Sequence, residues 1–160
     1  MKKLLAPGLA LYFGGLYPRS FKKPEGTIAI LGLGGNIGDV PRRFGKLALQ
    51  LARHPRVRLI ATAPILKNPP FGYASQPDFY NTLIAVETKL SPKELLRFVL
   101  RLERRHKRVR TFKNAPRTLD IDIIFYGDRT VKSEELIIPH PHWSERESVI
   151  IPLKYLLERL

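Results

Sequence analysis

Two aspartates stand two positions apart in a segment that otherwise has the composition of a buried strand. The segment is PRTLDIDIIFYGD, residues 116–128, and the acids are Asp120 and Asp122, here called the acid pair. Side chains on a strand alternate between its faces, so both carboxylates are expected on the same face. Same-face residues lie roughly 6.5 to 7 Å apart, and like charges that close repel unless a cation or a proton lies between them. The acid pair therefore predicts a partner of positive charge beyond the neighbouring Arg117.

The same alternation divides the rest of this strand. Ile124 is expected on the face of the acid pair. The opposite face, which should lie against the core, is expected to carry Leu119, Ile121, Ile123 and Phe125.

Basic residues are in large excess and gather just before the acid pair. The chain has 28 Lys and Arg against 14 Asp and Glu, and its net charge of +14 attracts polyanions such as nucleic acid, anionic membranes or nucleotide phosphates. Residues 97–117 contain nine bases and one acid, Glu103. Alone, such a run is typical of a solvated helix face followed by a basic loop. Beside an acid pair that binds metal, it favours a site of phosphate transfer.

Length and composition limit the other possibilities. At 160 residues the chain is most simply one domain with a substantial core. It has no cysteine, which excludes disulfides, thiolate metal sites and thiol nucleophiles. The lack of cysteine is compatible with the cytoplasmic location that we expect.

The first 26 residues resemble a signal peptide only superficially. Their apolar stretch, residues 4–17, is too short to span a bilayer and is interrupted by proline and glycine. No small-residue cleavage site follows it. We expect no membrane association and interpret residues 1–26 as an N-terminal extension that packs on the domain or stays mobile. The domain itself is expected at residues 27–160.

Hydrophobic periodicity predicts four strands and two helices. Strands are expected at residues 27–33, 57–66 and 79–88, with the segment of the acid pair as the fourth. The first helix should begin after Asp39 as its N-cap and should bury one face, made of Val40, Phe44, Leu47 and Leu51.

The second helix should begin at a capping box formed by Ser91 and Glu94 and should run to about residue 105. Its inward face is expected to carry Leu95, Val99 and Leu102.

The order β-α-β-β-α-β, followed by an irregular proline-rich C-terminal part, is typical of the α+β class. We expect a ferredoxin-like, largely antiparallel sheet with a four-stranded core and with helices packed on it. Many unrelated functions use this arrangement, so it identifies none of them. The glycine turn at residues 32–38 lacks the spacing of a dinucleotide fingerprint and is interpreted as a tight strand-to-helix turn.

Five segments occur in the order seen in one enzyme family. They are LGLGGNIGD, the loop and strand NPPFG...QPDFYNT, the spacing E-x4-R-V-R from Glu103, PRTLDIDIIFYGD, and IPHPHWSER. Through these segments, residues 27–154 resemble the 6-hydroxymethyl-7,8-dihydropterin pyrophosphokinases. The resemblance implies an enzyme of folate biosynthesis that transfers the β,γ-diphosphate of ATP to the hydroxymethyl group of the reduced pterin and releases AMP.

The resemblance also implies the nucleotide side of a site. The acid pair matches two aspartates that hold two Mg²⁺ ions against the ATP phosphates, and carboxylate oxygens suit Mg²⁺. Loop arginines that close over the triphosphate match Arg108, Arg110 and Arg117. Positions that contact ATP match Glu103, His140 and Arg146, and an apolar contact to the base matches Ile123.

Pterin-binding positions of the family match Pro69, Phe71, Phe79 and Asn81. An amide can pair with the pterin edge, and a ring can stack on its face. Ser148 stands where the family often has an aromatic residue as the second wall of the pterin pocket. We expect Trp143 or Phe71 to supply part of that wall.

Two other functions remain open from the residues alone. Net charge and fold order also suit a basic RNA-binding module, although acids on the sheet face would repel a phosphate backbone. A Mg²⁺-dependent nucleotidyltransferase or nuclease would keep the acids and change the substrate. We favour the pyrophosphokinase, with ATP and reduced pterin as partners and without nucleic acid. The sequence does not decide the oligomeric state, for which a monomer is one possibility.

Overall fold

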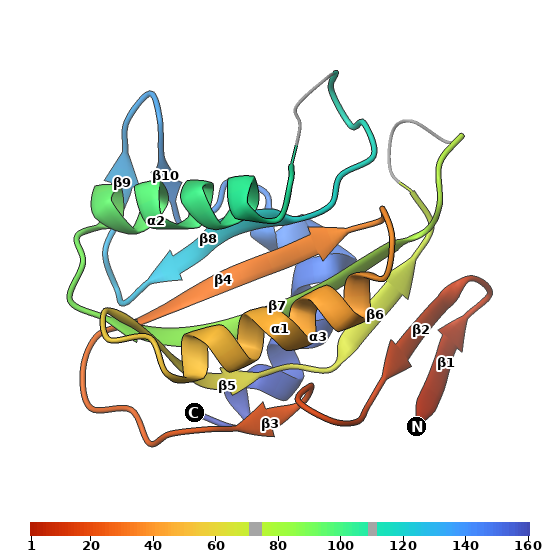
Figure 1. Cartoon of the computed structure of the whole chain (residues 1–160), viewed down its shortest axis with the longest axis horizontal. Coiled ribbons are helices and arrows are strands. Elements are labelled where there is room, and N and C mark those ends of the chain that lie inside the picture. Colours follow the sequence, from red (N-terminus) through yellow and green to blue (C-terminus); the bar gives the residue numbers. More distant parts are fainter. Residues whose placement is uncertain (71–74, 109–111) are drawn as a thin grey trace.

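One large antiparallel sheet organises the fold, and helices cover both of its faces (Figure 1). The computed structural model of the protein describes residues 1–70, 75–108 and 112–160, so the expected site residues Phe71 and Arg110 lie outside the described residues. In Figure 1, helices α1 (Val40–Ala52) and α2 (Pro92–Arg105) lie in front of the sheet, and α3 (Glu147–Leu157) lies behind it. The sheet is thus the middle of three layers.

The strand that carries the first predicted segment is β4 (Ile28–Gly35). It pairs with β7 (Phe79–Thr88) on one side and with β8 (Asp120–Tyr126) on the other. Beyond β7 lie β5 (Val57–Thr62) and β6 (Ile65–Asn68), which pair with successive parts of β7. All of these pairings are antiparallel, which confirms the α+β class and the largely antiparallel sheet.

The strand expected at residues 57–66 is two strands, because the ladder is interrupted at Ala63 and Pro64. Proline has no N–H group to donate to a neighbouring strand. The hydroxyl of Thr82 in β7 donates instead to the carbonyl oxygens of Ala63 and Pro64, at 3.2 and 3.0 Å. Sequence periodicity did not reveal the break because the residues on both sides of it are apolar.

The N-terminal residues add further strands to this sheet. β1 (Lys2–Ala6) and β2 (Leu9–Tyr12) form a hairpin, here called the N-terminal hairpin, and β2 pairs with β6. β3 (Arg19–Ser20) pairs with β5. Counted over the described residues, the sheet has eight strands and extends well beyond the predicted four-stranded core.

Both predicted helices form, α1 with the predicted start and α2 with the predicted start and end. The Asp39 side chain accepts a hydrogen bond from the Arg42 amide at the start of α1. Ser91 and Glu94 form the capping box of α2 in both directions. The residues expected to face inward are all buried: Val40, Phe44, Leu47, Leu51, Leu95, Val99 and Leu102.

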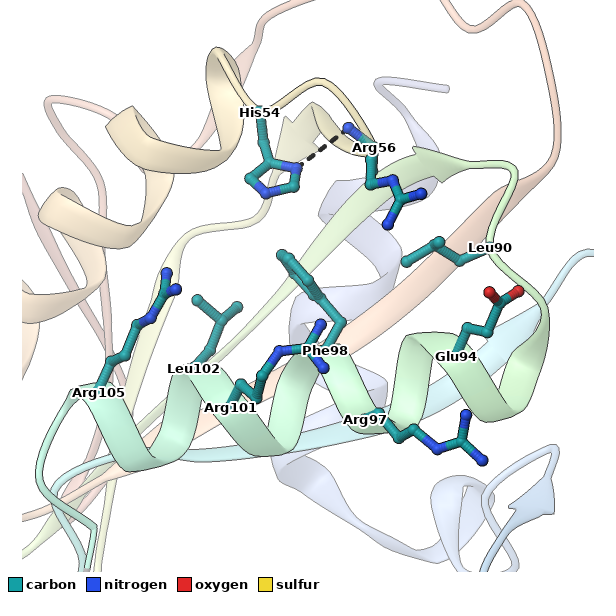
Figure 2. A pocket seen from close by; sticks show the side chains of 9 residues that line it. All are labelled: His54, Arg56, Leu90, Glu94, Arg97, Phe98, Arg101, Leu102 and Arg105. Atoms are coloured by element: carbon teal, nitrogen blue, oxygen red, sulfur yellow. Dashed lines mark hydrogen bonds between the residues drawn. The ribbon is translucent and has the colours of Figure 1, made fainter.

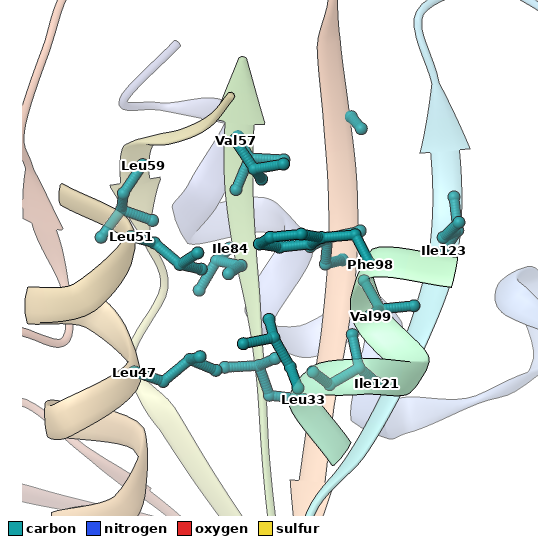
Figure 3. Close-up of a cluster of buried hydrophobic side chains, with 14 of the residues drawn as sticks. Leu33, Leu47, Leu51, Val57, Leu59, Ile84, Phe98, Val99, Ile121 and Ile123 are labelled. Atoms are coloured by element: carbon teal, nitrogen blue, oxygen red, sulfur yellow. The ribbon is translucent and has the colours of Figure 1, made fainter. Parts of the chain in front are cut away.

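The space between the sheet and helices α1 and α2, here called the helix-side core, holds the larger of two apolar clusters (Figure 3). In Figure 3, Leu47 of α1 and Val99 of α2 gather around Leu33 of β4 and Ile121 of β8. Burial of one such side chain stabilises the fold by roughly 1.5 to 3 kcal/mol. These contacts hold β8 against the helices.

The C-terminal part is more regular than the sequence predicted. β9 (Val131–Lys132) and β10 (Ile137–Ile138) precede a 3-10 helix at Trp143–Glu145 and then α3. Pro152 lies inside α3, and sequence analysis missed this helix because proline usually ends one. α3 buries Val149, Pro152 and Leu156, on the side of the sheet opposite to α1 and α2.

A bulge in β8 changes the direction of its last side chains. One step along β4, from Leu31 to Ile30, corresponds to two steps along β8, from Ile123 to Phe125. Such a bulge interrupts the alternation of faces. Ile124 and Phe125 both pack in the cluster on the α3 side, so the prediction that Phe125 faces the helix-side core is wrong. The helix-side core does contain the other predicted residues, Leu119, Ile121 and Ile123.

Two leucines of the N-terminal hairpin test whether it stabilises the domain. Replacing Leu11 by Ala should lower the free energy of unfolding by about 2 to 5 kcal/mol, because Leu11 is fully buried. The same change at Leu4, which is 67% exposed in the adjoining strand, should cost less than about 0.5 kcal/mol. Urea denaturation measures both values. Equal and small losses would show that the hairpin adds no stability.

Candidate functional site

The acid pair lies at the start of β8. Asp120 is opposite Gly34 of β4, and Asp122 is opposite Gly32. Ile124, the next residue on the same face, belongs to the cluster on the α3 side, so both carboxylates point to that side of the sheet. This confirms the common direction that the strand alternation predicted for the acids and Ile124.

Strand β4 has no side chain between the acid pair and β7. Gly34 pairs with Asp120 on one side and with Asn81 on the other, and Gly32 occupies the next position on this face. A Cβ atom on Gly34 would lie 2.7 Å from Asn81 Oδ1. Because neighbouring strands are about 4.8 Å apart, Asp120 and Asn81 stand roughly 10 Å apart across these glycines. A molecule lying on this glycine strip can contact both side chains.

Arg108, which follows the end of α2, compensates part of the negative charge of the acid pair. Its Nη1 donates to Asp120 Oδ1 at 2.5 Å and to Glu103 Oε2 at 3.2 Å. The same Glu103 oxygen accepts from the Ile121 amide at 2.7 Å, which ties α2 to β8. Glu103 is only 3% exposed, so the predicted contact of its carboxylate with ATP is not available in this structure.

Arg117 connects the acid pair with the ring of Phe79. Its Nη1 lies 3.4 Å from Asp120 Oδ2, and its guanidinium carbon lies 5.2 Å from the centre of the Phe79 ring. The second distance is within the range of a cation–π interaction. The Ala115 carbonyl accepts hydrogen bonds from Nε and Nη2 of Arg117, at 3.2 and 3.1 Å, and so fixes the guanidinium group between the two partners.

Burial and repulsion raise the pKa of the Asp122 carboxyl to about 7. Desolvation is the largest cause, the charge of Asp120 is the next, and Glu103 acts in the same direction. Arg146 and Arg108 oppose these effects by stabilising the charged form. The acid pair is therefore short of positive charge, which a bound cation would supply.

The C-terminal segment brings a histidine and an arginine to the acid pair. The His140 amide donates to the Ile124 carbonyl at 3.0 Å, beside the bulge of β8. Arg146 is close enough to lower the pKa of Asp122. The pKa of His140 is lowered mainly by burial and then by Arg146, while Asp120 acts against this shift. The structure thus gathers these two predicted residues around the acids.

The acid pair suits a hard divalent cation such as Mg²⁺. This ion prefers oxygen ligands, keeps several waters, and is commonly bound by one or two carboxylates together with substrate phosphates. Within residues 1–70, 75–108 and 112–160, no group of three or more His, Asp or Glu side chains could hold a metal. A cation held by the acid pair would draw its remaining ligands from water and a substrate.

The predicted pterin residues at the start of β7 border the glycine strip. Phe79 and Asn81 are two positions apart and share one face of the strand. Asn81 Nδ2 donates to Asn68 Oδ1 at 2.7 Å, which fixes the amide. Pro69 follows directly, and its Cγ lies 3.5 Å from the position of a Cβ atom on Gly8, in the turn of the N-terminal hairpin. The N-terminal hairpin therefore lies beside Pro69, just after the end of β6.

The side chain of Ile123 lies away from this site. It is 4% exposed and packs in the helix-side core, on the face of β8 opposite to the acid pair (Figure 3). Strand alternation accounts for this position, because Ile123 follows Asp122 directly. The predicted apolar contact of this side chain with the ATP base is therefore not available here.

Trp143 also lies away from the pterin residues. Its ring packs against Phe125, with ring centres 5.1 Å apart. Phe125 is opposite Ile30 of β4, whereas the residue next to Phe79 is opposite Gly35, and these positions are roughly 16 Å apart along the strand. The structure does not support Trp143 as the second wall, which leaves Phe71, outside the described residues, as the remaining candidate.

Sequence analysis missed Asn36, a buried polar residue. The glycine turn at residues 32–38 was interpreted as a connection only, because glycine and asparagine are common in turns. In the structure Asn36 is 4% exposed, and its side chain bonds to the segments that precede β7 and β8. A buried amide cannot be distinguished from an exposed turn residue by its sequence neighbours alone.

A pocket of about 360 Å³ lies along α2 (Figure 2). Its arginines are Arg56, Arg97, Arg101 and Arg105, and they surround His54 and Phe98. None of the site residues predicted from the sequence lines this pocket. Only part of the basic run before the acid pair therefore serves the acids, and its α2 portion fits the alternative of a solvated helix face.

Comparison with known proteins identifies one family. A profile of the 7,8-dihydro-6-hydroxymethylpterin-pyrophosphokinase family matches residues 30–158. A 2-amino-4-hydroxy-6-hydroxymethyldihydropteridine pyrophosphokinase of Helicobacter pylori is 42% identical over 141 residues, which cover 86% of each chain. The protein of the same name from Campylobacter jejuni is 39% identical over 135 residues, covering 84% of this chain and 83% of that one. Folic acid synthesis protein fol1 of Schizosaccharomyces pombe is 35% identical over 133 residues, which are 83% of this chain and 18% of fol1.

The raised pKa of Asp122 predicts that Asp122→Asn stabilises the metal-free protein at pH 8. The pKa rises from 3.8 to about 7, so the folded state binds this proton more tightly than the unfolded state. The stability due to this group is complete below pH 3.8 and is lost as the pH rises through about 7. The variant should therefore exceed the parent in free energy of unfolding by about 2 to 4 kcal/mol at pH 8, and the gap should close toward pH 4.

Denaturation between pH 4 and pH 9 in the presence of a chelator measures this difference. Asp128→Asn removes one carboxylate at an exposed site in the turn after β8 and is the matched control. An Asp122→Asn protein that is less stable than the parent at pH 8 would contradict the assigned repulsion.

Proposed function

The chain belongs to the 7,8-dihydro-6-hydroxymethylpterin-pyrophosphokinase family, and we propose how its residues perform the reaction of that family. It is an ATP-dependent pyrophosphokinase of folate biosynthesis. The reaction moves diphosphate from ATP to the hydroxymethyl group of 6-hydroxymethyl-7,8-dihydropterin and releases AMP. Neither RNA binding nor nuclease activity is favoured by these relationships.

The observation that carries the proposal is the acid pair beside the glycine strip. In our proposal Asp120 and Asp122 would hold two Mg²⁺ ions, which would supply positive charge against the ATP phosphates. The raised pKa of Asp122 supports this role, because it marks a site with a deficit of positive charge. The carboxylates thereby set the position of the donor phosphates on this face of the sheet.

Arg108 and Arg117 meet the charge of the transferred group. Both now donate to Asp120. If a cation occupied the acid pair, the N–H groups of both arginines could turn to phosphate oxygens, which the guanidinium group matches well. Because Arg117 also lies over Phe79, it stands where the donor phosphate and the acceptor pterin would meet.

The pterin would lie over the glycine strip, with its edge at Asn81 and its face against Phe79. The amide can pair with the pterin edge, and the ring offers a stacking surface. Pro69 lies at the same end of the sheet, because it follows Asn68, whose side chain accepts a hydrogen bond from Asn81. With no side chains on Gly32 and Gly34, the hydroxymethyl group could point across β4 toward the acid pair.

His140 and Arg146 are assigned to the nucleotide, because both interact electrostatically with the acid pair. Arg146 lowers the pKa of Asp122, and the charge of Asp120 acts to raise the pKa of His140. Glu103 takes a different role from the one implied by the family resemblance. It is buried and bonds to Arg108 and to the Ile121 amide, so we assign it to hold Arg108 beside Asp120.

The proposal also includes the finer fold class. Strands β5, β7, β4 and β8 lie side by side in this order with antiparallel neighbours. This order supports a ferredoxin-like core, to which the N-terminal strands are an addition.

The acid pair can be tested directly by product analysis. The parent protein, given ATP, Mg²⁺ and the reduced pterin, should form AMP and the pterin pyrophosphate in equal amounts. Asp120→Asn and Asp122→Asn should each lose about 100-fold or more in turnover, because an amide keeps the shape but not the charge, and a principal electrostatic group is worth roughly 3 kcal/mol. Asp128→Asn, with the same chemistry at an exposed position, should keep its activity. Near-normal turnover of either acid-pair variant at limiting Mg²⁺ would refute its assignment.

The arginines should act on the chemical step more than on ATP affinity. Arg108→Ala and Arg117→Ala are expected to lower the single-turnover rate by about 100-fold, because groups that meet charge in the transition state contribute there most. Binding of a non-hydrolysable ATP analogue should change much less. Arg104→Ala, exposed on α2, is the control of like chemistry. Rates like that of Arg104→Ala in both variants would limit these arginines to pairing with the acids.

A further inference from the structure

Asn36 uses its whole side chain to bond two segments that lie far from it in sequence. Its Nδ2 donates to Gln76 Oε1 at 2.8 Å and to the Pro77 carbonyl at 3.1 Å. Its Oδ1 accepts from the Arg117 amide at 2.9 Å, and its own amide donates to the Arg117 carbonyl at 2.9 Å. An amide side chain is suited to this position because it offers donors and an acceptor together.

Each bonded segment leads into a strand that carries one half of the site. Gln76 and Pro77 lie within three residues of the start of β7, which begins with Phe79. Arg117 precedes β8, which begins with Asp120. A second link joins the same segments, since Gln76 Nε2 donates to the Asn114 carbonyl at 2.9 Å. Asn36 therefore lies at the junction of the pterin side and the phosphate side.

The turn that carries Asn36 is itself held firmly against the segment before β8. A Cβ atom on Gly35 would lie 2.6 Å from the Thr118 carbonyl oxygen, so only glycine permits this approach. Arg43 of α1 donates to the carbonyl oxygens of Thr118 and Ile37, at 2.7 and 2.8 Å. Asn36 is thus anchored to β4 and α1 while it bonds outward to the other two segments.

We propose that Asn36 is a positioning residue that sets the pterin side of the site in register with the phosphate side. The proposal rests on the function proposed above and extends it to a residue that need not touch either substrate. Removing the amide would leave backbone groups of Arg117 and Pro77 without a partner and would release the two segments from each other. A misplacement of about 1 Å between reacting groups can cost about 100-fold in rate.

The test separates alignment from binding and from stability. Asn36→Ala should lower the single-turnover rate about 100-fold, while the affinities for pterin alone and for an ATP analogue alone change less than about threefold, because each pocket remains intact. Gln76→Ala removes a half-buried side chain, which should not affect folding, and keeps the hydrogen bond from Asn36 to the Pro77 carbonyl. Its single-turnover rate should fall about 10-fold. The double variant should be no slower than Asn36→Ala, since both act through one junction.

Thr82→Val is the matched control. Thr82 is also a buried polar residue with bonds to two backbone carbonyls, but these belong to Ala63 and Pro64 rather than to a segment of the site. It should lower the melting temperature and leave the single-turnover rate within about threefold of the parent. Hydrogen exchange gives a readout that needs no activity: Asn36→Ala should speed exchange in residues 75–78 and 112–118 together, and Thr82→Val should not.

The proposal is overturned if Asn36→Ala and Thr82→Val lose rate equally, or if weaker substrate binding accounts for the whole loss in Asn36→Ala. It is also overturned if the losses of Asn36→Ala and Gln76→Ala multiply in the double variant. Failure of the assigned catalytic roles would look different, because the Asp120→Asn protein would then stay active while the exchange of both segments still depended on Asn36.

Discussion

Two carboxylates on one face of one strand repel each other, and much of the structure follows from the need to keep them there. The opposite face of β8 packs Ile121 and Ile123 in the helix-side core, so the strand cannot rotate to relieve the repulsion. Compensation comes from outside the strand instead. Arg108 reaches Asp120 while it bonds to Glu103 of α2, and Arg117 approaches Asp120 from the loop before β8. The apolar core therefore sustains a charge arrangement that is unfavourable by itself.

A second requirement is that backbone, rather than side chains, fills the space between the two halves of the site. Gly34 separates Asp120 from Asn81, and Gly35 allows the carbonyl of Thr118 to approach the turn after β4. Larger residues would close the strip or push the segment before β8 away. The glycines weaken β4 as a strand, because glycine loses more conformational freedom on folding than any other residue. Pairing of β4 on both edges, with β7 and β8, offsets that weakness.

The sequence predicted well whatever depends on local pattern. The caps of α1 and α2, the buried faces of both helices, the bounds of β7 and the common direction of the acids all follow from spacing of a few residues. Prediction from the sequence failed where contacts between residues far apart in the chain determine the structure. The bulge that turns Phe125 away from the helix-side core, the break at Pro64 and the formation of α3 around Pro152 depend on partners elsewhere in the chain. In the site, residue types identified the acid pair and Arg117, but only the fold could show that Glu103 is enclosed, that Ile123 faces the core, or that Asn36 lies between two segments.

The basic character of the chain acts at two ranges. At short range only Arg108 and Arg117, among the described bases of residues 97–117, make ion pairs with Asp120. Arg97, Arg101 and Arg105 line a pocket along α2 instead. Yet they contribute to a net charge of +14, and such a field raises the rate at which anions reach a protein. The screening length is about 8 Å at physiological salt, so this attraction is felt near the surface and weakens as salt is added. In the proposed function, charge spread over the surface would attract the nucleotide, and the few groups that meet at the start of β8 would position it.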